Sequence, residues 1–310
     1  MEYRALGQTG LSVSAVSFGT GPLGEMYEPM TEAEAMSLVD ETIDLGVNSF
    51  DTSPYYGTAE YRLGKALTPS KREKIVLATK AGRYGVSDFD FSPERMRASL
   101  ERSLKTMNTD YVDIFYLHDI EFVSLDSIFA ESYNELVKLK EEGKCRAIGM
   151  SGYPIKTFTR VITETEVDVV LTYAKGTLLD DSITTELKPL ADAKGVGLIN
   201  AAAVALGLLT PQGGKINPDH QAPIVVQEAA KRMVELARER GIDVAFLANQ
   251  YAIQRTGTAT TMAGIGNSSQ LHSAVDAAST PIDEFILQEF LALRPPAGQR
   301  QWRIGMEENN

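Results

Sequence analysis

Eight short apolar segments, separated by longer amphipathic ones, constrain the fold of this chain more than any other feature. They cover residues 15–19, 46–50, 75–79, 112–117, 145–150, 167–171, 197–201 and 260–264. Because they are rich in Val, Ile, Ala and Phe and show no polar alternation, they are typical of strands buried on both faces. Eight β–α units predict a closed (β/α)8 barrel of the TIM type, with a doubly wound open sheet as the alternative.

Amphipathic segments between these strands predict the helices. They cover residues 31–45, 59–67, 93–107, 125–142, 155–163, 182–194, 225–240 and 268–278, with two further helices at 244–254 and 282–293. Thr31 with Glu34 forms a capping box, and Ser92 precedes a first-turn proline as an expected cap. A glycine stop signal follows four of the helices, at Gly46, Gly143, Gly195 and Gly241.

The two ends of the chain lie outside this repeating pattern. Residues 3–6 and 11–13 around 7–10 predict a hairpin that plugs the bottom of the barrel, and the tail from Arg294 is polar and expected to be loop. A length of 310 residues is normal for one α/β barrel, and no repeat or linker divides the chain. We therefore expect a single domain over residues 1–310.

Composition narrows the partners. A net charge of -12 disfavours nucleic acid and anionic membranes, which would repel an acidic surface. The single Cys145 excludes an internal disulfide and a cysteine metal cluster, and we expect no metal site. With neither a secretory signal nor a spanning apolar run visible, the cytoplasm is the expected location.

Gly19-Thr-Gly-Pro-Leu-Gly24 matches a dinucleotide-binding pattern and follows a strand. That pattern works by placing a helix N-terminus directly beneath the pyrophosphate. Here Pro22 and the segment 25–30 intervene before the capping box, so we interpret it as a flexible strand-end loop.

Four side chains with complementary acid–base chemistry fall at the ends of three successive strands. Asp51 and Tyr56 follow the second strand, Lys80 the third and His118 the fourth. Because strand ends converge at the mouth of a barrel, these side chains become neighbours. A lysine ammonium within about 4–6 Å lowers the pKa of a tyrosine, and Asp51 can pair with Lys80. The group suits polarising a carbonyl while a cofactor supplies hydride.

Each of the four also has a structural interpretation, as a turn, a solvated strand end, a core aromatic or a rim histidine. Lys80 could alternatively form a Schiff base in a lyase, although a nearby carboxylate would keep its amine protonated.

Three segments together resemble the aldo-keto reductase superfamily: FDTSPYYG at 50–57, ATK at 78–80 and YVDIFYLH at 111–118. Similarity extends from 4–14 through 139–144 to 207–210. Segments 82–84, 89–92, 118–122 and 124–126 are most similar to L-galactose dehydrogenases and related aldose 1-dehydrogenases. The resemblance implies Tyr56 as general acid–base, supported by Asp51, Lys80 and His118, and a nicotinamide cofactor across the barrel mouth.

The resemblance also implies contacts for cofactor and substrate. The expected cofactor contacts are Gly19, Thr20, Asp51, Ser151, Thr172, Asn200, Ala202, Gly207, Gly264, Gly266, Asn267 and Gln270. The expected substrate contacts are Tyr27, Tyr55, Tyr84, Phe89, His118, Glu121 and Phe122. Trp302 in the tail either folds over the site or covers apolar surface.

Several positions depart from the family pattern. The usual Ser-Pro is Ala202-Ala203, and the asparagine that often follows Ser151 is Gly152. Gln270 stands where phosphate-binding members carry arginine, so NAD is favoured over NADP. The acidic–Asn pair often used for adenine is Ser273-Ala274.

The sequence thus predicts an NAD(P)-dependent oxidoreductase that oxidises the C1 hydroxyl of an aldose, similar to L-galactose or L-fucose, to the lactone. A carbonyl reductase acting on pyridoxal-like or other aldehydes and a nicotinamide-binding regulatory subunit are the alternatives. A small sugar or aldehyde is the expected partner, and a monomer or small homo-oligomer the expected state.

Overall fold

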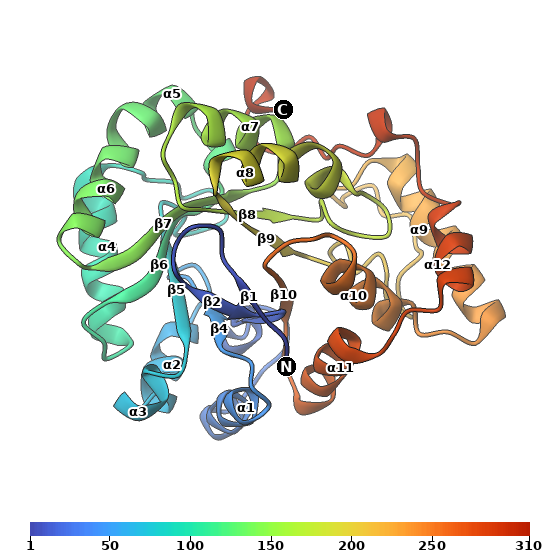
Figure 1. The fold of residues 1–310 in the computed structure, drawn as a ribbon, viewed down its shortest axis with the longest axis horizontal. Coiled ribbons are helices and arrows are strands. Elements are labelled where there is room, and N and C mark those ends of the chain that lie inside the picture. The colour runs from blue at the N-terminus through green and yellow to red at the C-terminus, as the bar shows by residue number, and fades with distance from the viewer.

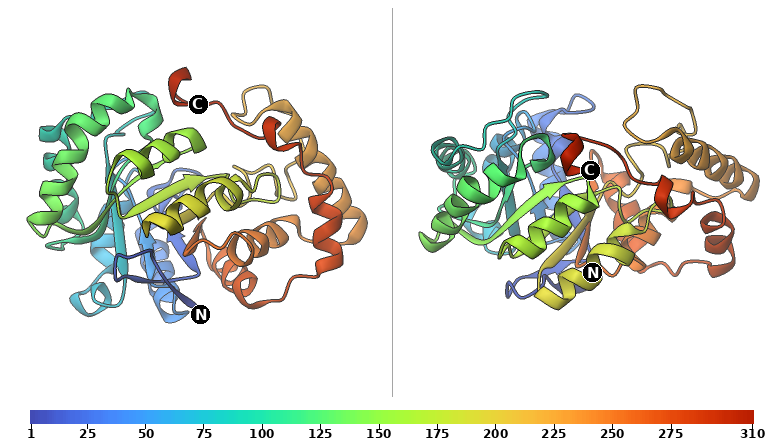
Figure 2. Two further views of the ribbon diagram at one scale, coloured as in Figure 1. Left: turned by 45° about the horizontal axis from the view of Figure 1, so that its top comes forward. Right: turned by 90° about the horizontal axis from the view of Figure 1, so that it is seen from above.

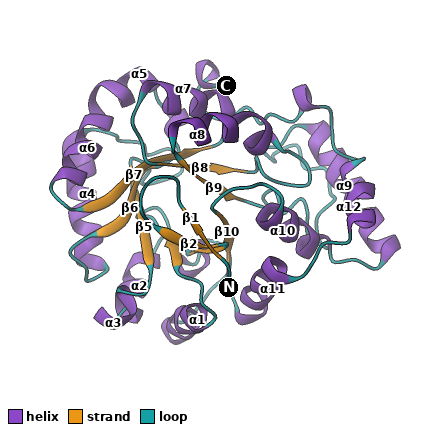
Figure 3. Ribbon diagram, viewed as in Figure 1, coloured by secondary structure: helices purple, strands orange, loops and turns teal.

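The computed structural model describes residues 1–310, and eight parallel strands close into a barrel at its centre (Figures 1 and 3). The strands are β3 (Val16–Gly19), β4 (Ser49–Asp51), β5 (Val76–Ala81), β6 (Val112–Leu117), β7 (Cys145–Gly152), β8 (Val169–Tyr173), β9 (Gly197–Ala201) and β10 (Thr260–Gly264). The last strand, β10, pairs with both β9 and β3. All eight predicted strands and the barrel are confirmed, and the open sheet is wrong because no strand edge is left free.

Helices surround the barrel in Figure 3. They are α1 (Glu32–Asp44), α2 (Ala59–Ala66), α3 (Pro69–Arg72), α4 (Pro93–Thr106), α5 (Leu125–Ser127), α6 (Tyr133–Glu141), α7 (Ile155–Glu164), α8 (Lys188–Lys194), α9 (Ile224–Arg240), α10 (Val244–Gln254), α11 (Ser268–Ser279) and α12 (Glu284–Leu291). Short π-helical stretches at Ile128–Ser132 and Ile183–Leu187 interrupt the α-helical geometry of two of the predicted helices. The ten predicted helical segments are confirmed, and α3 was not expected.

Most of the predicted helix boundaries are confirmed. Thr31 and Glu34 form both hydrogen bonds of the capping box. The four glycine stop signals all have positive φ, from 65° to 81°. Ser92 is the exception, because its hydroxyl donates to Asp90 Oδ1 at 2.7 Å and accepts nothing from the first turn of α4.

The N-terminal hairpin consists of β1 (Tyr3–Ala5) and β2 (Ser12–Ser14), paired antiparallel. Leu6 and Leu11 share an apolar cluster with the inward side chains of the barrel. Gly7 lies so close to the backbone of Gly197, the first residue of β9, that a side chain there would overlap it. The hairpin therefore closes the amino ends of the strands, as predicted.

Alternation along each strand decides which residues reach the mouth. In β8, Val169 and Leu171 belong to the inner cluster, whereas Val170 belongs to the layer between strands and helices. The same rule puts Ile199 and Ala201 of β9 inside.

The tail, residues 294–310, runs from α12 back across the molecule toward α7 (Figure 2). Arg294 fastens its start by donating to the carbonyl oxygens of Leu178 and Thr177 at 2.8 and 3.1 Å. Asn309 fastens its end by donating to those of Glu121 and Val123, both at 2.9 Å. The tail therefore covers loops that follow the carboxyl ends of the strands. None of the helices combines the length and apolar character needed to cross a membrane.

Candidate active site

The structure brings together the four side chains predicted from the strand ends. Asp51 is the last residue of β4, and Lys80 lies near the end of the neighbouring β5. His118 follows β6, which pairs with β5. The backbone N–H of His118 donates to the carbonyl oxygen of Ala81 at 2.8 Å, which ties it to β5. Tyr56 enters from the loop after β4.

Lys80 is the centre of this group and is fully buried. Its ammonium donates to Asp51 Oδ1, to the carbonyl oxygen of Thr52 at 2.9 Å and to the Tyr56 hydroxyl at 3.3 Å. Because an ammonium has three hydrogens, these contacts satisfy it fully. Lys80 is thus held as a charged hydrogen-bond donor to Tyr56, which is unfavourable for the Schiff-base alternative.

The expected acidification of Tyr56 is not what the structure favours. Removal from water raises the pKa of Tyr56 well above its ordinary value, and the nearby Asp51 carboxylate raises it further. Asp51 also offsets the charge of Lys80, so the ammonium acts as one half of an ion pair. The phenol is therefore protonated at neutral pH, which is the state that donates a proton.

His118 is buried and neutral. Burial lowers the pKa of His118 well below its usual range, and the charges of Lys80 and Arg83 lower it further. Its Nδ1 lies 3.1 Å from Ser53 Oγ, which also accepts from the backbone N–H of Tyr55 at 3.1 Å. The Ser53 hydroxyl can accept that N–H and still donate to Nδ1, and in this arrangement the imidazole proton lies on Nε2. Ser53 was not predicted as a site residue, although it lies within the motif at 50–57 that also carries Asp51 and Tyr56.

Gly24, the last glycine of the dinucleotide-like pattern, has a packing role. Residues Gly21–Gly24 form a short 3-10 turn, and α1 begins only at Glu32, so no long helix starts beneath the pattern. A Cβ at Gly24 would overlap the carbonyl oxygen of Tyr56. The glycine lets the backbone that carries Tyr56 approach the strand ends.

Three of the predicted substrate contacts surround one arginine. The Arg83 guanidinium lies 4.3 Å from the ring centre of Tyr55, 5.5 Å from that of Phe89 and 5.7 Å from that of Phe122. Arg83 also forms an ion pair with Asp119. Neither charged residue was predicted as a site residue. Arg83 lies in segment 82–84, which is part of the family resemblance, and Asp119 follows His118 directly.

The two other predicted contacts lie at the edge of this group. Tyr27, on the loop before α1, is 75% exposed as a residue, but its phenol lies near the site: Tyr55 adds to the effect of burial in raising the pKa of Tyr27, and Tyr27 in turn is one of the groups that raise the pKa of Tyr56. Tyr84 packs beneath Arg95 of α4, with 4.4 Å between the guanidinium and the ring centre.

Glu121, the remaining predicted substrate contact, is fully buried and has one oxygen, Oε2, without a partner. Its other oxygen accepts from the backbone N–H of Tyr153 at 3.0 Å. Burial raises the pKa of Glu121 well above its ordinary value, and the Asp119 carboxylate adds to this effect. A Cβ at Gly152 would overlap Oε2, so the glycine in place of the family's asparagine makes room for this carboxyl group.

Aromatic side chains that were not predicted complete this side of the mouth. Tyr153 packs against Tyr173, the last residue of β8, with 4.8 Å between ring centres. Trp302 stacks on Tyr153 at 5.9 Å and is only 2% exposed. It also belongs to an apolar cluster with side chains of α9, α10 and α12, and its folding over the site itself stays a prediction. Extending the sixth predicted strand, 167–171, by two residues would have placed Tyr173 on the inner face.

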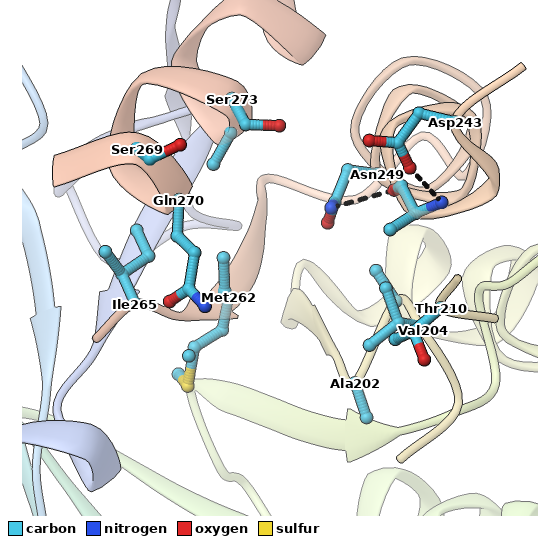
Figure 4. Close-up of a pocket in the computed structure, with 15 residues that line it drawn as sticks. Ala202, Val204, Thr210, Asp243, Asn249, Met262, Ile265, Ser269, Gln270 and Ser273 are labelled. Atoms are coloured by element: carbon cyan, nitrogen blue, oxygen red, sulfur yellow. Dashed lines mark hydrogen bonds between the residues drawn. The ribbon is translucent and has the colours of Figure 1, made fainter. Parts of the chain in front are cut away.

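A cavity of about 360 Å³ lies between the loop after β9, the end of β10, and helices α10 and α11 (Figure 4). The predicted cofactor contacts Ala202, Gly264 and Gln270 line it. The lining has no Lys or Arg, and its one charged residue is Asp243.

Other predicted cofactor contacts lie at the strand ends around the barrel mouth or near the start of α11. Gly19 pairs with Gly264, and the next residue, Thr20, is buried with an unpartnered hydroxyl. Ser151 and Thr172 are the penultimate residues of the neighbouring strands β7 and β8. Because Leu171 and Tyr173 face inward, Thr172 points to the outer layer, where its hydroxyl donates to the Tyr153 carbonyl oxygen at 3.4 Å. Asn267 caps α11, and the backbone N–H of Gly266 donates to Gln270 Oε1 at 2.8 Å.

Two predicted cofactor contacts lie elsewhere. Asn200 is fully buried between Ile199 and Ala201, which face inward, so its side chain points to the outer layer, where it donates to the Gly176 carbonyl oxygen at 2.9 Å. Gly207 has a φ of 91° in the loop after β9 and does not line the cavity. The alternation rule, applied to the end of β9, could have excluded Asn200.

An elongated dinucleotide fits these residues: the cavity offers apolar walls and polar groups. Thr20, with its unpartnered hydroxyl, follows β3, the strand between β10 at the cavity and β4, which precedes Tyr56. The barrel and this arrangement of acid–base groups are those of a nicotinamide-dependent oxidoreductase. The Aldo/keto reductase family model matches residues 15–292, and the chain belongs to this family.

Comparisons with known proteins agree with this assignment. The chain is 41% identical to L-galactose dehydrogenase from Arabidopsis thaliana, over 100% of this chain and 99% of that protein. It is 31% identical to D-arabinose 1-dehydrogenase from Saccharomyces cerevisiae, over 86% and 83% of the two chains. An aldo-keto reductase from Bacillus halodurans, solved in its holo form, superposes with a TM-score of 0.79 at 27% identity, over 100% of this chain and 99% of that one.

Proposed function

We propose that this protein oxidises the C1 hydroxyl of an aldose, such as L-galactose or L-fucose, to the lactone. The observation that carries the proposal is the buried Lys80 that links Asp51 to the Tyr56 hydroxyl beside a neutral His118. The names of the two relatives above, L-galactose dehydrogenase and D-arabinose 1-dehydrogenase, support an aldose as substrate.

The proposed roles follow from protonation states. His118, with its proton on Nε2, donates a hydrogen bond to the C1 oxygen and fixes its place beside Tyr56. Tyr56 in its phenolate form takes the proton from that oxygen, and Lys80 stabilises the phenolate by its hydrogen bond. A bound nicotinamide dinucleotide supplies the hydride acceptor. Loss of a proton and a hydride from the C1–OH group leaves the lactone carbonyl.

The group around Arg83 is proposed to hold the sugar ring. The rings of Tyr55, Phe89 and Phe122 pack around the Arg83 guanidinium, and the ring surface that Arg83 leaves uncovered suits the C–H groups of a sugar. Asp119 Oδ1 and Glu121 Oε2 are buried without partners, and a buried polar atom of this kind is costly unless a ligand pairs with it. Sugar hydroxyls suit both atoms, because a hydroxyl donates to a carboxylate oxygen and accepts from a protonated carboxyl group.

We further propose NAD as the preferred cofactor. NADP differs by a 2′-phosphate, which is usually held by Arg or Lys. The cavity offers Gln270 at its rim and the acidic Asp243 in its wall. A dianionic phosphate would meet no cation in that lining.

The test is the initial rate of NADH formation at 340 nm with L-galactose, L-fucose, D-arabinose and their enantiomers, repeated with NADP. We expect turnover of at least one of these sugars, with NAD preferred. Absence of turnover for the whole panel would contradict the proposal.

Aldehyde reduction is the second candidate, because the protonated Tyr56 phenol is the state that donates to a carbonyl oxygen. A relative from Microbacterium luteolum, 26% identical, is named pyridoxal 4-dehydrogenase, which supports an aldehyde as substrate, although as one that is oxidised. Faster turnover of pyridoxal and other aldehydes than of any aldose would favour it.

We propose that residues 1–310 act as one domain, since both the hairpin and the tail pack on the barrel. A monomer or small homo-oligomer in the cytoplasm is compatible with the lone, buried Cys145 and the acidic net charge, which also disfavours nucleic acid.

A further inference from the structure

The cavity between α10 and α11 has two walls of different chemistry. On the α11 side, the cavity is lined by Ser269, Gln270 and Ser273. Ser273-Ala274 stands where members of the family often carry an acidic residue and an asparagine that bind adenine. These short side chains leave that wall without a carboxylate or an asparagine.

The opposite wall, formed by the first half of α10, carries both missing groups. Asp243 caps this helix and Asn249 lies one turn beyond Ala245, and all three line the cavity. Figure 4 shows the Asn249 amide pointing into the gap that faces Ser273. An acid and an amide are therefore present, on the other helix.

The hydrogen bonds of these two side chains define what they can offer a ligand. Asn249 Nδ2 donates to the Ala245 carbonyl oxygen at 3.0 Å, which leaves Oδ1 as a free acceptor. Asp243 Oδ1 accepts from the N–H groups of Ala245 and Phe246 at 2.8 and 3.2 Å, which leaves Oδ2 free. Both free atoms are acceptors, so they suit a ligand with hydrogen-bond donors.

The rest of the lining suits a flat apolar ring. Val204, Met262 and Ile265 are hydrophobic, and Ala245 and Ala274 leave space on the two helices. Adenine combines such a ring with an exocyclic amino group that donates two hydrogen bonds.

We propose that Asn249, assisted by Asp243, binds the adenine amino group of the dinucleotide from α10, in place of a pair on α11. This inference rests on the dinucleotide of the proposed function and names the residues that recognise its adenine. Asn249 is thus a specificity-determining residue for the base.

The test is calorimetric titration with NAD⁺ and with nicotinamide hypoxanthine dinucleotide, in which a carbonyl oxygen replaces the amino group. The wild-type protein is expected to bind NAD⁺ at least about tenfold more tightly, because the analogue sets an acceptor against an acceptor. In Asn249→Ala we expect most of this ratio to be lost, through weaker NAD⁺ binding, with the remainder due to Asp243.

Two further variants sharpen the result. Asp243→Ser keeps a good helix cap while removing the free carboxylate oxygen, and should lose part of the ratio. Ser273→Ala, on the opposite wall, should keep the wild-type ratio. Retained binding of the analogue shows that each variant is folded.

The outcomes separate this inference from the proposed function. A wild-type protein that binds NAD⁺ but does not distinguish the analogue, or an Asn249→Ala variant that keeps the full ratio, overturns only the role of Asn249. A wild-type protein that binds neither dinucleotide overturns both.

Discussion

At the residue scale, the protonation state of Tyr56 depends on how far the charges of the buried Lys80 and Asp51 cancel. Asp51 is almost fully buried, and burial raises its pKa while Lys80 lowers it. Their ion pair has little net charge, so Tyr56 receives a hydrogen bond without a strong electrostatic reason to ionise. The pairing of Lys80 with Asp51 was predicted from the strand ends, but the raised pKa of Tyr56 was not, because it depends on burial, which strand-end spacing does not give.

The pH dependence of aldose oxidation follows from the raised pKa of Tyr56. Because the phenolate is the proton acceptor, its fraction rises about tenfold per pH unit below the pKa. We therefore expect kcat/KM for oxidation to rise between pH 7 and 9 with a logarithmic slope near one. Since the lowered pKa keeps His118 neutral, no break is expected near pH 6.5. Initial rates across this range provide the measurement, and a plateau from pH 7 upward would contradict it.

At the scale of elements, Tyr56 is positioned by the contact between two strand-end loops. The 3-10 turn Gly21–Gly24 follows β3, and the loop with Tyr56 follows the adjacent β4. Only a glycine at position 24 permits the observed approach to the Tyr56 carbonyl oxygen.

Gly24→Ala should therefore displace the loop and lower activity. A shift of about 1 Å at a catalytic group can cost a hundredfold in rate, so we expect kcat to fall at least about tenfold. Overpacking should also lower the free energy of unfolding by about 1–3 kcal/mol. Steady-state kinetics and urea unfolding measure the two effects. Gly298→Ala is the control, because a Cβ there meets nothing within 4 Å; equal behaviour of the two variants would refute the role of Gly24.

The sequence predicts elements better than the partners of their side chains. All eight strands follow from buried apolar runs, and the tetrad follows because parallel strand ends must meet at one mouth. Arg83, Asp119 and Asn249 did not follow, because their roles depend on contacts between segments that are distant in the chain. Asn200 was placed on the wrong face because the alternation of β9 was not applied to its final residues.

At the scale of the whole molecule, the last residues of the chain are part of the wall around the proposed sugar site. Asn309 donates to two carbonyl oxygens in the loop that carries Glu121, and Thr157 of α7 donates to the Asn309 carbonyl oxygen at 2.8 Å. The tail thus connects that loop with the outer helices.

Removing the Asn309 amide should loosen this wall. Asn309→Ala leaves two carbonyl oxygens without their donor, so we expect about 1–3 kcal/mol less stability to urea. We also expect a higher KM for the sugar with an unchanged dissociation constant for NAD⁺, whose cavity lies at α10 and α11. Glu307→Ala, exposed in the same tail, is the control. A KM equal to that of the control would show that the tail does not shape the sugar site.

The most direct test of the account is the turnover of Tyr56→Phe at saturating aldose and NAD⁺. Removing the hydroxyl deletes the proton acceptor, and positioned acid–base groups contribute about 10²–10⁴-fold. We predict a loss of kcat in that range with NAD⁺ binding unchanged, while Tyr61→Phe on the surface of α2 keeps wild-type turnover. Turnover of Tyr56→Phe within a few-fold of wild type would contradict the central role of this tyrosine.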